Sequence, residues 1–197
     1  MVMTKTNKVL IVSNRSRYEE DIIALCQKYG MCVDIIDFEN YDGNSFNHDI
    51  IILSGGHCMT IEGNEEYFAG QIKLLQSVAV PVIGICLGFE IIVKAFGGKL
   101  IEMPINEKCE LTIKKLVDDD IFSGIDKIKA YENHKWKVKD LPYSLMPLAT
   151  SCYGVEVVKH ISEPIYGFQF HPEESKFEDC GLKLFENIFT KLRAGIL

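Results

Sequence analysis

The sequence predicts an α/β protein with an open, mostly parallel sheet, helices on both faces, and a small additional β region in the C-terminal half. Two observations carry this prediction. In the first half of the chain, short continuous apolar runs alternate with stretches of helical periodicity, which is typical of parallel strands covered on both faces. After Gly97-Gly98 the pattern changes to shorter β-like pieces. We expect a single domain over residues 1–197, because no repeat, low-complexity linker or boundary divides the chain.

The first half supplies four expected strands. Val9–Val12 is an apolar run that ends in Ser13-Asn14 and is followed by a helical pattern that stops at Gly30. The apolar face of this helix carries Ile22, Ile23, Leu25, Cys26 and Tyr29. Three further apolar runs predict strands at residues 32–38, 49–53 and 81–85. The segment 65–77 can form another helix.

The second half reads as a β region closed by a helix. The β-like pieces lie at residues 99–103, 111–116, 155–159 and 165–170. Residues 177–192 have the periodicity of an amphipathic helix. This order adds a small β region to the parallel sheet.

Composition and charge narrow the class of protein. The chain has 21 Lys and Arg against 28 Asp and Glu, a formal net charge of −7, with no basic run. This argues against a nucleic-acid-binding surface and favours a small molecule or another protein as partner. The start of the chain lacks a secretory signal, and the longest uncharged stretch, residues 74–89, is broken by Pro81 and too short to span a membrane. We expect a soluble cytoplasmic protein.

The cysteines point to a reducing compartment. There are seven of them and no Cys-x-x-Cys pair, which fits neither a disulfide framework nor a zinc ribbon. Cys26 and Cys32 are expected in the core, because free cysteine behaves as a small apolar residue.

The most informative motif is Gly84-Ile85-Cys86-Leu87-Gly88, where an apolar strand runs into a helix. It has the form of a nucleophile elbow with cysteine in place of serine. At a helix N-terminus the macrodipole favours the thiolate, which is the nucleophilic form, and the N–H of Leu87 becomes a candidate oxyanion donor. A buried structural cysteine in a tight turn is the alternative that this motif alone leaves open.

A thiol nucleophile needs a base, and His171 is the best placed of the five histidines. It ends the run Tyr166–Phe170 and is followed by Pro172 and Glu173. On an extended segment, residues two apart lie on one side, so the Glu173 carboxylate can orient the imidazole and stabilise its protonated form. His48, His57 and His160 are expected at the surface.

Ser54-Gly55-Gly56-His57 closes the third expected strand, next to the elbow strand. Paired glycines let backbone N–H groups approach a ligand closely, so Gly56 is the candidate for the second oxyanion donor and Gly55 for a substrate contact. A plain tight turn is the alternative.

Taken together, Ser-Gly-Gly at 54–56, Gly-Ile-Cys-Leu-Gly at 84–88 and Tyr-Gly-Phe-Gln-Phe-His-Pro-Glu at 166–173 resemble the class I, or triad, glutamine amidotransferases. The resemblance covers nearly the whole chain and implies a flavodoxin-like fold. It also implies hydrolysis of the side-chain amide of L-glutamine by Cys86, His171 and Glu173. The ammonia would pass to a synthetase subunit that binds ATP and the acceptor. The chain has no P-loop, and no cofactor or metal is expected.

The resemblance extends to one further segment. Asn133-His134-Lys135-Trp136 is similar to the Asn-His-x-aromatic segment of carbamoyl-phosphate synthetase small subunits, which implies that Asn133, Lys135 and Trp136 help to hold glutamine and that His134 is a positioned loop residue. The spacing from Trp136 to the His-Pro-Glu is similar to the glutaminase subunit of GMP synthetase. GMP synthesis is therefore the acceptor reaction that the resemblance favours.

Two alternatives to this function remain open, and the first follows from a departure from the family pattern. The family usually has Gln four residues after the nucleophile, in contact with glutamine, whereas this chain has Glu90. Cys-Leu-Gly-Phe-Glu also occurs in γ-glutamyl hydrolases, so a hydrolase of γ-glutamyl compounds that works without a partner is the second hypothesis. A non-catalytic, glutamine-sensing subunit is the third.

Overall fold

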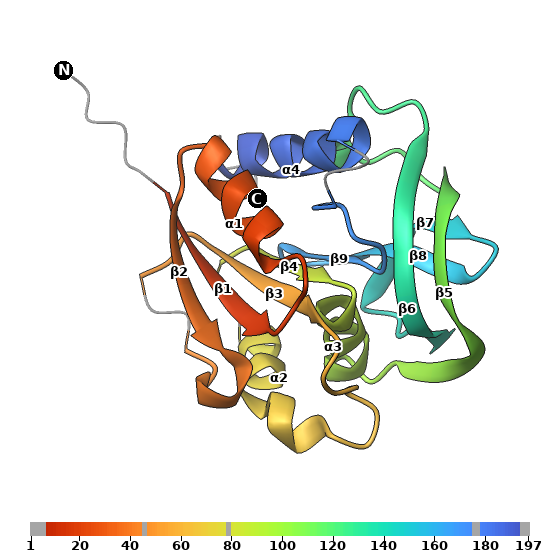
Figure 1. Ribbon diagram of the computed structural model, residues 1–197, viewed down its shortest axis with the longest axis horizontal. Coiled ribbons are helices and arrows are strands. Elements are labelled where there is room, and N and C mark those ends of the chain that lie inside the picture. Colours follow the sequence, from red (N-terminus) through yellow and green to blue (C-terminus); the bar gives the residue numbers. More distant parts are fainter. Residues whose placement is uncertain (1–6, 45–46, 78–79, 175–177, 194–197) are drawn as a thin grey trace.

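The computed structural model describes residues 7–44, 47–77, 80–174 and 178–193, whose strands form one curved sheet (Figure 1). The strand order is β2-β1-β3-β4-β9-β8-β7-β5-β6. The strands are β1 (Lys8–Asn14), β2 (Cys32–Asp37), β3 (Ile50–Gly56), β4 (Val82–Ile85), β5 (Lys99–Lys115), β6 (Ile128–Asp140), β7 (Leu145–Ser151), β8 (Gly154–His160) and β9 (Ile165–Phe168).

The first five strands of that order, β2 to β9, are parallel to one another, and the remaining pairs are antiparallel. The α-helices are α1 (Glu19–Lys28), α2 (Ala69–Gln76), α3 (Leu87–Ala95) and α4 (Glu178–Arg193). Short 3₁₀ helices cover Phe38–Asn40, Glu65–Phe68 and Asp120–Phe122. The predicted α/β class, the mostly parallel sheet and the added β region are confirmed.

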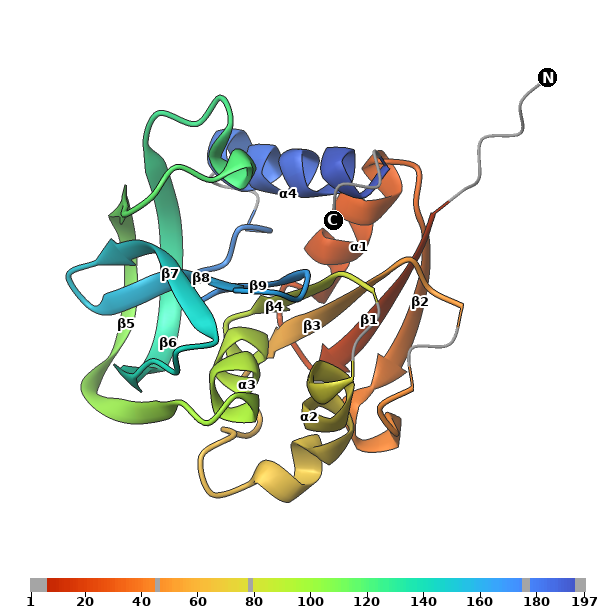
Figure 2. The same ribbon diagram turned by 180° about the vertical axis from the view of Figure 1, so that it is seen from behind.

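Helices cover both faces of the parallel half. Seen from behind in Figure 2, α1 and α4 lie on one side of the sheet and α2 and α3 on the other. Each side has its own apolar core: Ile22, Leu184 and Phe185 belong to one, and Leu74, Phe89 and Ile92 to the other. Strands with apolar side chains on both faces therefore read as continuous apolar runs, which is the pattern that predicted them.

The antiparallel half differs from the sequence prediction in detail. β5 is one long strand where two pieces were expected, with a shift of register between Glu102 and Glu107, and β6 and β7 were not anticipated. β6 was missed because its buried positions alternate correctly but include Glu132 and His134, so the alternation does not appear as an apolar pattern.

The structure also tests the expected positions of individual residues. The prediction that His134 lies in a loop is wrong, because this residue is part of β6. His160 is buried, with its ring 4.5 Å from that of Phe96, rather than at the surface. Cys32 is exposed at the start of the edge strand β2, whereas Cys26 is fully buried as expected. α4 begins at Glu178 in the structure, and Phe177, where the helix was predicted to begin, lies outside the described residues.

No helix among the described residues combines the length and apolar character needed to cross a membrane.

Candidate active site

Cys86 occupies the turn between β4 and α3. Its backbone has φ 51° and ψ −103°, a positive φ that is rare for a residue with a side chain and is typical of strained functional turns. Its N–H donates to the carbonyl of Phe168 in β9 at 2.8 Å, and its carbonyl accepts from the N–H of Glu90 at 3.0 Å. These two bonds hold the thiol at the carboxyl end of the parallel strands, where ligands of open α/β sheets bind.

The two glycines of this turn are required by close packing. A β-carbon on Gly88 would lie 2.2 Å from the carbonyl oxygen of Leu53 in β3, and one on Gly84 would lie 2.6 Å from the carbonyl oxygen of Gly88. Helix α3 can therefore approach β3 and β4 only because neither position has a side chain. This is the physical reason for the Gly-x-Cys-x-Gly spacing.

His171 and Glu173 follow β9 and face the same site. His171 Nδ1 lies 2.9 Å from Glu173 Oε1, and both side chains are buried. The N–H of His171 donates to the carbonyl of Tyr131 in β6 at 3.1 Å. The ring of Tyr18 lies 4.8 Å from the imidazole. The imidazole is thus fixed by a carboxylate, a neighbouring strand and an aromatic ring.

The electrostatics of the site couple the thiol to this imidazole. Burial raises the pKa of the Cys86 thiol, and interaction with His171 lowers it in part. Burial alone would lower the pKa of His171, but the Glu173 carboxylate and Cys86 raise it well above its ordinary value. A proton that leaves the thiol is therefore well accommodated on His171, because the imidazolium is stabilised by the buried carboxylate.

Cys86 and His171 open onto a pocket of about 550 Å³. Only 5% of Cys86 is exposed, but the residue lines this pocket, so the thiol faces a cavity rather than the interior of the core. Gly55 lies between the two: a β-carbon there would be 3.1 Å from His171 Cε1 and 3.5 Å from Cys86 Cβ. The glycine keeps this space open beside both reactive side chains.

The candidate oxyanion donors and binding residues from the sequence come together at the pocket. Its lining includes Gly56, Leu87, Glu90, Asn133, Lys135 and Trp136. Gly56 is packed so closely that a β-carbon would lie 2.6 Å from both the Asn14 carbonyl oxygen and Leu87 Cδ2. Lys135 forms an ion pair with Glu102, so its charge already has a partner.

Glu90 is a buried carboxyl group in the first turn of α3. It is 4% exposed and accepts a hydrogen bond from Gln169 Nε2 at 3.3 Å. Burial raises its pKa to about 7, although His134 and Gln169 act in the opposite direction. The pocket therefore presents a carboxyl that is protonated in an appreciable fraction of molecules near neutral pH.

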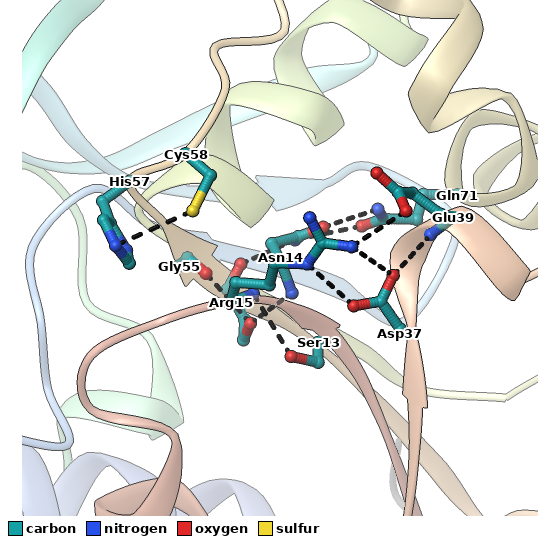
Figure 3. A network of polar contacts seen from close by, with 10 residues as sticks. Ser13, Asn14, Arg15, Asp37, Glu39, Gly55, His57, Cys58 and Gln71 are labelled. Atoms are coloured by element: carbon teal, nitrogen blue, oxygen red, sulfur yellow. Dashed lines mark hydrogen bonds and ion pairs between the residues drawn. The ribbon is translucent and has the colours of Figure 1, made fainter.

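A polar network behind the pocket fixes the loop that follows β1 (Figure 3). Asn14 donates to the Ser54 carbonyl at 2.8 Å and accepts from Gln71 Nε2 at 2.7 Å. Arg15 has a φ of 64° and turns its guanidinium to Asp37 and Glu39, at 2.9 Å from each. The chain can then place Ser16, Arg17 and Tyr18 at the pocket wall.

Sequence reasoning missed several residues at this site. The sequence contains no recognisable signal for Tyr18, which packs against His171 from the loop after β1. It also contains none for Glu132 and Glu156, because a single charged residue in a strand is usually exposed, whereas these two are buried. Gln169 was visible inside the Tyr-Gly-Phe-Gln-Phe-His-Pro-Glu motif but was given no role.

One group of described residues has the composition of a metal site. The ligand atoms of Glu132, His134 and Glu156 lie within 4.8 Å of one another, and all three side chains are buried.

Comparison with known proteins identifies a family over almost the whole chain. The family model described as glutamine amidotransferase class-I matches residues 10–192. A glutamine-hydrolyzing GMP synthase subunit from Methanothermobacter thermautotrophicus is 35% identical over 146 residues, which is 73% of this chain and 75% of that protein. The protein of the same name from Pyrococcus abyssi is 35% identical over 177 residues, or 86% and 91% of the two chains.

Solved structures agree on the fold. A Thermoplasma acidophilum protein provisionally assigned as the same GMP synthase subunit superposes with a TM-score of 0.87 at 24% identity, over 98% of this chain and 96% of that one. A glutamine amidotransferase from Thermotoga maritima gives a TM-score of 0.79 at 17% identity, over 96% and 99% of the two chains.

Proposed function

This chain belongs to the class-I glutamine amidotransferase family, and from that premise we propose that Cys86, His171 and Glu173 hydrolyse the side-chain amide of L-glutamine and that the ammonia passes to a partner synthetase. The observation that carries the proposal is that Cys86 and His171 line the same pocket, while Glu173 Oε1 lies 2.9 Å from Nδ1 of the His171 imidazole. A thiol, a base and an orienting carboxylate are the components of nucleophilic amide hydrolysis.

In the first half-reaction Cys86 Sγ attacks the δ-carbon of glutamine, and His171 takes the thiol proton. A C–S bond forms, and the amide π electrons move to the oxygen. The backbone N–H groups of Gly56 and Leu87 are the proposed donors to this oxyanion. When the tetrahedral intermediate collapses, the C–N bond breaks, and His171 gives its proton to the leaving nitrogen, which departs as ammonia.

In the second half-reaction a water molecule attacks the thioester. His171 takes a proton from the water, and the C–S bond breaks with its electron pair going to the sulfur. The Cys86 thiolate then recovers a proton from His171, which regenerates the thiol as glutamate leaves. Glu173 remains ionised throughout and stabilises the imidazolium that forms twice in the cycle. We propose that the substrate contacts come from residues at the pocket. Gly55 lies beside both reactive side chains, and the pocket is lined by Glu90, Asn133, Lys135 and Trp136.

The partner is proposed to bind ATP and the acceptor, and GMP synthesis is the acceptor reaction that the names of the relatives favour. We further propose that the chain works as one domain over residues 1–197. We also propose that it acts in the cytoplasm, because an odd number of cysteines with no Cys-x-x-Cys pair in the sequence fits a reducing compartment.

A Cys86→Ala variant tests the proposal. Ammonia release from glutamine is measured with the wild type and the variant, each with the protein that co-purifies with this chain. We expect the variant to lose ammonia release while it still binds the partner. Retained ammonia release would refute the role of Cys86.

Glu90 keeps the second hypothesis open, because a buried carboxyl stands where the family usually has an amide. A hydrolase of γ-glutamyl compounds would turn over a γ-glutamyl peptide faster than glutamine in the absence of any partner. Turnover of glutamine alone, increased by the partner, supports the amidotransferase.

A further inference from the structure

At the back of the pocket lies a group of ionisable side chains that the proposed reaction does not use. Glu132 and His134 extend from β6 and Glu156 from β8, and their exposed fractions are 0%, 3% and 1%. In the part of the chain that the structure describes, no Lys or Arg forms an ion pair with either carboxylate. Two carboxylates buried beside one imidazole are costly, so further positive charge has to balance them.

The hydrogen bond of His134 leaves its second ring nitrogen directed at this group. Nδ1 lies 2.7 Å from the carbonyl oxygen of Trp136, which can only accept, so Nδ1 carries hydrogen. In the neutral ring Nε2 then has a free lone pair, which is the form of histidine that binds metal ions. Nε2 lies 2.8 Å from Glu132 Oε2, but the two atoms are not aligned as a hydrogen bond. Two atoms that bind one ion have this relation, because each points at the ion and not at the other.

The carboxylates contribute further buried atoms that make no hydrogen bond. These are both oxygens of Glu132 and Oε2 of Glu156. The other oxygen of Glu156, Oε1, accepts from Ser151 Oγ, as metal-ligating carboxylates accept from their outer partners. Buried polar atoms are nearly always bonded, so such atoms on three side chains that face one another point to a ligand that binds all three.

The separations and charges suit one divalent ion. The ligand atoms of the three residues lie within 4.8 Å of one another. Atoms that bind one ion at about 2.1 Å are roughly 3.0–3.4 Å apart, and the observed separations, 2.8 Å for one pair and up to 4.8 Å for the group, span this value. Two carboxylates and a neutral imidazole carry two negative charges, which a divalent cation neutralises. A donor set that includes imidazole favours Zn²⁺ and related transition metals over Mg²⁺ and Ca²⁺.

From this arrangement we propose that Glu132, His134 and Glu156 form a binding site for one divalent transition-metal ion such as Zn²⁺. The ion reaches the site through the pocket, because His134 is part of the pocket lining. Three protein ligands leave the fourth position of a tetrahedral ion to a water molecule or another small donor. The site is separate from the three reactive residues and does not depend on the proposed reaction.

The bound ion links β6 to β8 beside the backbone that holds residues of the pocket. On β6, the Tyr131 carbonyl accepts from the N–H of His171 at 3.1 Å. On β8, the Glu156 carbonyl accepts from the N–H of Gln169 at 2.8 Å. Because the three ligands come together only in the folded chain, binding of the ion stabilises the fold and raises Tm.

Titration with Co²⁺ tests the site, because Co²⁺ replaces Zn²⁺ in proteins and its absorption spectrum shows whether a thiolate is among its ligands. The full chain is treated with a chelator, separated from it, and titrated with Co²⁺ and then with Zn²⁺. We expect one Co²⁺ per chain with no thiolate-to-metal band, displacement by Zn²⁺, and no displacement by Mg²⁺. With Zn²⁺ at about a hundred times its Kd, Tm should rise by about 5–10 °C.

Four variants locate the ion, and circular dichroism shows that each is folded without metal. Glu156→Gln keeps the size of the side chain but replaces a carboxylate ligand, so Kd for Co²⁺ should increase at least about 100-fold. Ser151→Ala removes the hydroxyl that bonds to Glu156, and Kd should increase about tenfold. Cys86→Ala should leave Kd unchanged. Glu110→Gln, which changes an exposed carboxyl on β5 that pairs with Lys129, is the matched control and should bind as the wild type does.

A wild-type chain that binds neither Co²⁺ nor Zn²⁺ would overturn the proposal, and this result needs no variant. Protons would then balance the two carboxylates. Binding that Cys86→Ala abolishes and Glu156→Gln leaves unchanged would also overturn it, because the ion would then lie at the reactive thiol. Ammonia release is not among these readouts, so a wild type that fails to hydrolyse glutamine would count against the proposed function alone.

Discussion

The contact between His171 and Glu173 makes a quantitative prediction. Glu173→Gln keeps the size of the side chain and removes its charge at a point where Nδ1 and Oε1 are 2.9 Å apart and both side chains are buried. The carboxylate is the main group that raises the pKa of His171 against the opposing effect of burial. In the variant the pKa of His171 should fall, because the interaction with Cys86 is then the main contribution left to oppose burial.

The distance sets the magnitude. Two unit charges at this separation attract each other by ~6 kcal/mol in a medium of effective dielectric constant about 20, which is an upper bound for the effect. A glutamine oxygen retains part of this attraction as a dipole, so we expect a loss of about 3 kcal/mol, equivalent to about two pKa units for His171 and about a 100-fold decrease in kcat/KM.

The pKa of His171 is read from the pH dependence of its Cε1 proton resonance in NMR spectra, and kcat/KM from ammonia release. Glu174→Gln is the control. It removes the charge of a buried neighbouring carboxylate but keeps the backbone N–H of residue 174, which donates to the His171 carbonyl. It should change the His171 pKa and kcat/KM by no more than a third as much as Glu173→Gln. A His171 pKa that stays within half a unit of the wild-type value in Glu173→Gln would refute the electrostatic role assigned to this carboxylate.

Three further predictions concern single atoms and single protons. Gly88→Ala would place a β-carbon 2.2 Å from the Leu53 carbonyl oxygen, so urea denaturation should show that the free energy of unfolding falls by at least about 2 kcal/mol. Gly63→Ala is the control: its β-carbon would enter open space, and the φ of 76° alone should lower the free energy of unfolding by about 1 kcal/mol. Gly55→Ala should leave the free energy of unfolding within about 1 kcal/mol but reduce kcat about tenfold, because its β-carbon would displace the catalytic imidazole by a few tenths of an ångström. Without a bound cation, Glu156 has a folded-state pKa of about 8 against an ordinary 4.5, so its contribution to stability is complete below pH 4.5 and is lost as the pH rises to 8. In urea denaturation with a chelator between these values, Glu156→Gln should gain stability over the wild type by at most about 1.4 kcal/mol per pH unit, and a difference that does not change with pH would contradict the assignment.

The parallel half of the fold could be predicted because its strands are buried on both faces. Continuous apolar runs such as Ile50–Leu53 indicate parallel strands when segments of helical periodicity separate them. The turn at Cys86 could also be predicted, since flanking glycines are required wherever a helix passes a strand at backbone contact. Local sequence is sufficient where a single close contact dictates the residue.

The antiparallel half could not be predicted to the same extent. β6 buries Glu132 and His134 in place of apolar residues, and their burial is possible only because Glu156 arrives from β8, far along the chain. A periodicity test reads such residues as exposed. The same long-range dependence hid Tyr18, whose contact with His171 depends on how the loop after β1 is held by Arg15, Asp37 and Glu39.

The most direct test of the proposed mechanism is to trap the covalent intermediate on Cys86. The chain and its co-purifying partner are mixed with glutamine, quenched in acid within milliseconds to seconds, and analysed by mass spectrometry after proteolysis. A γ-glutamyl thioester on Cys86, absent from Cys86→Ala and formed more slowly in a His171→Gln variant, is the predicted result. Release of ammonia with no such adduct on Cys86, or with the adduct on another cysteine, would contradict the central claim.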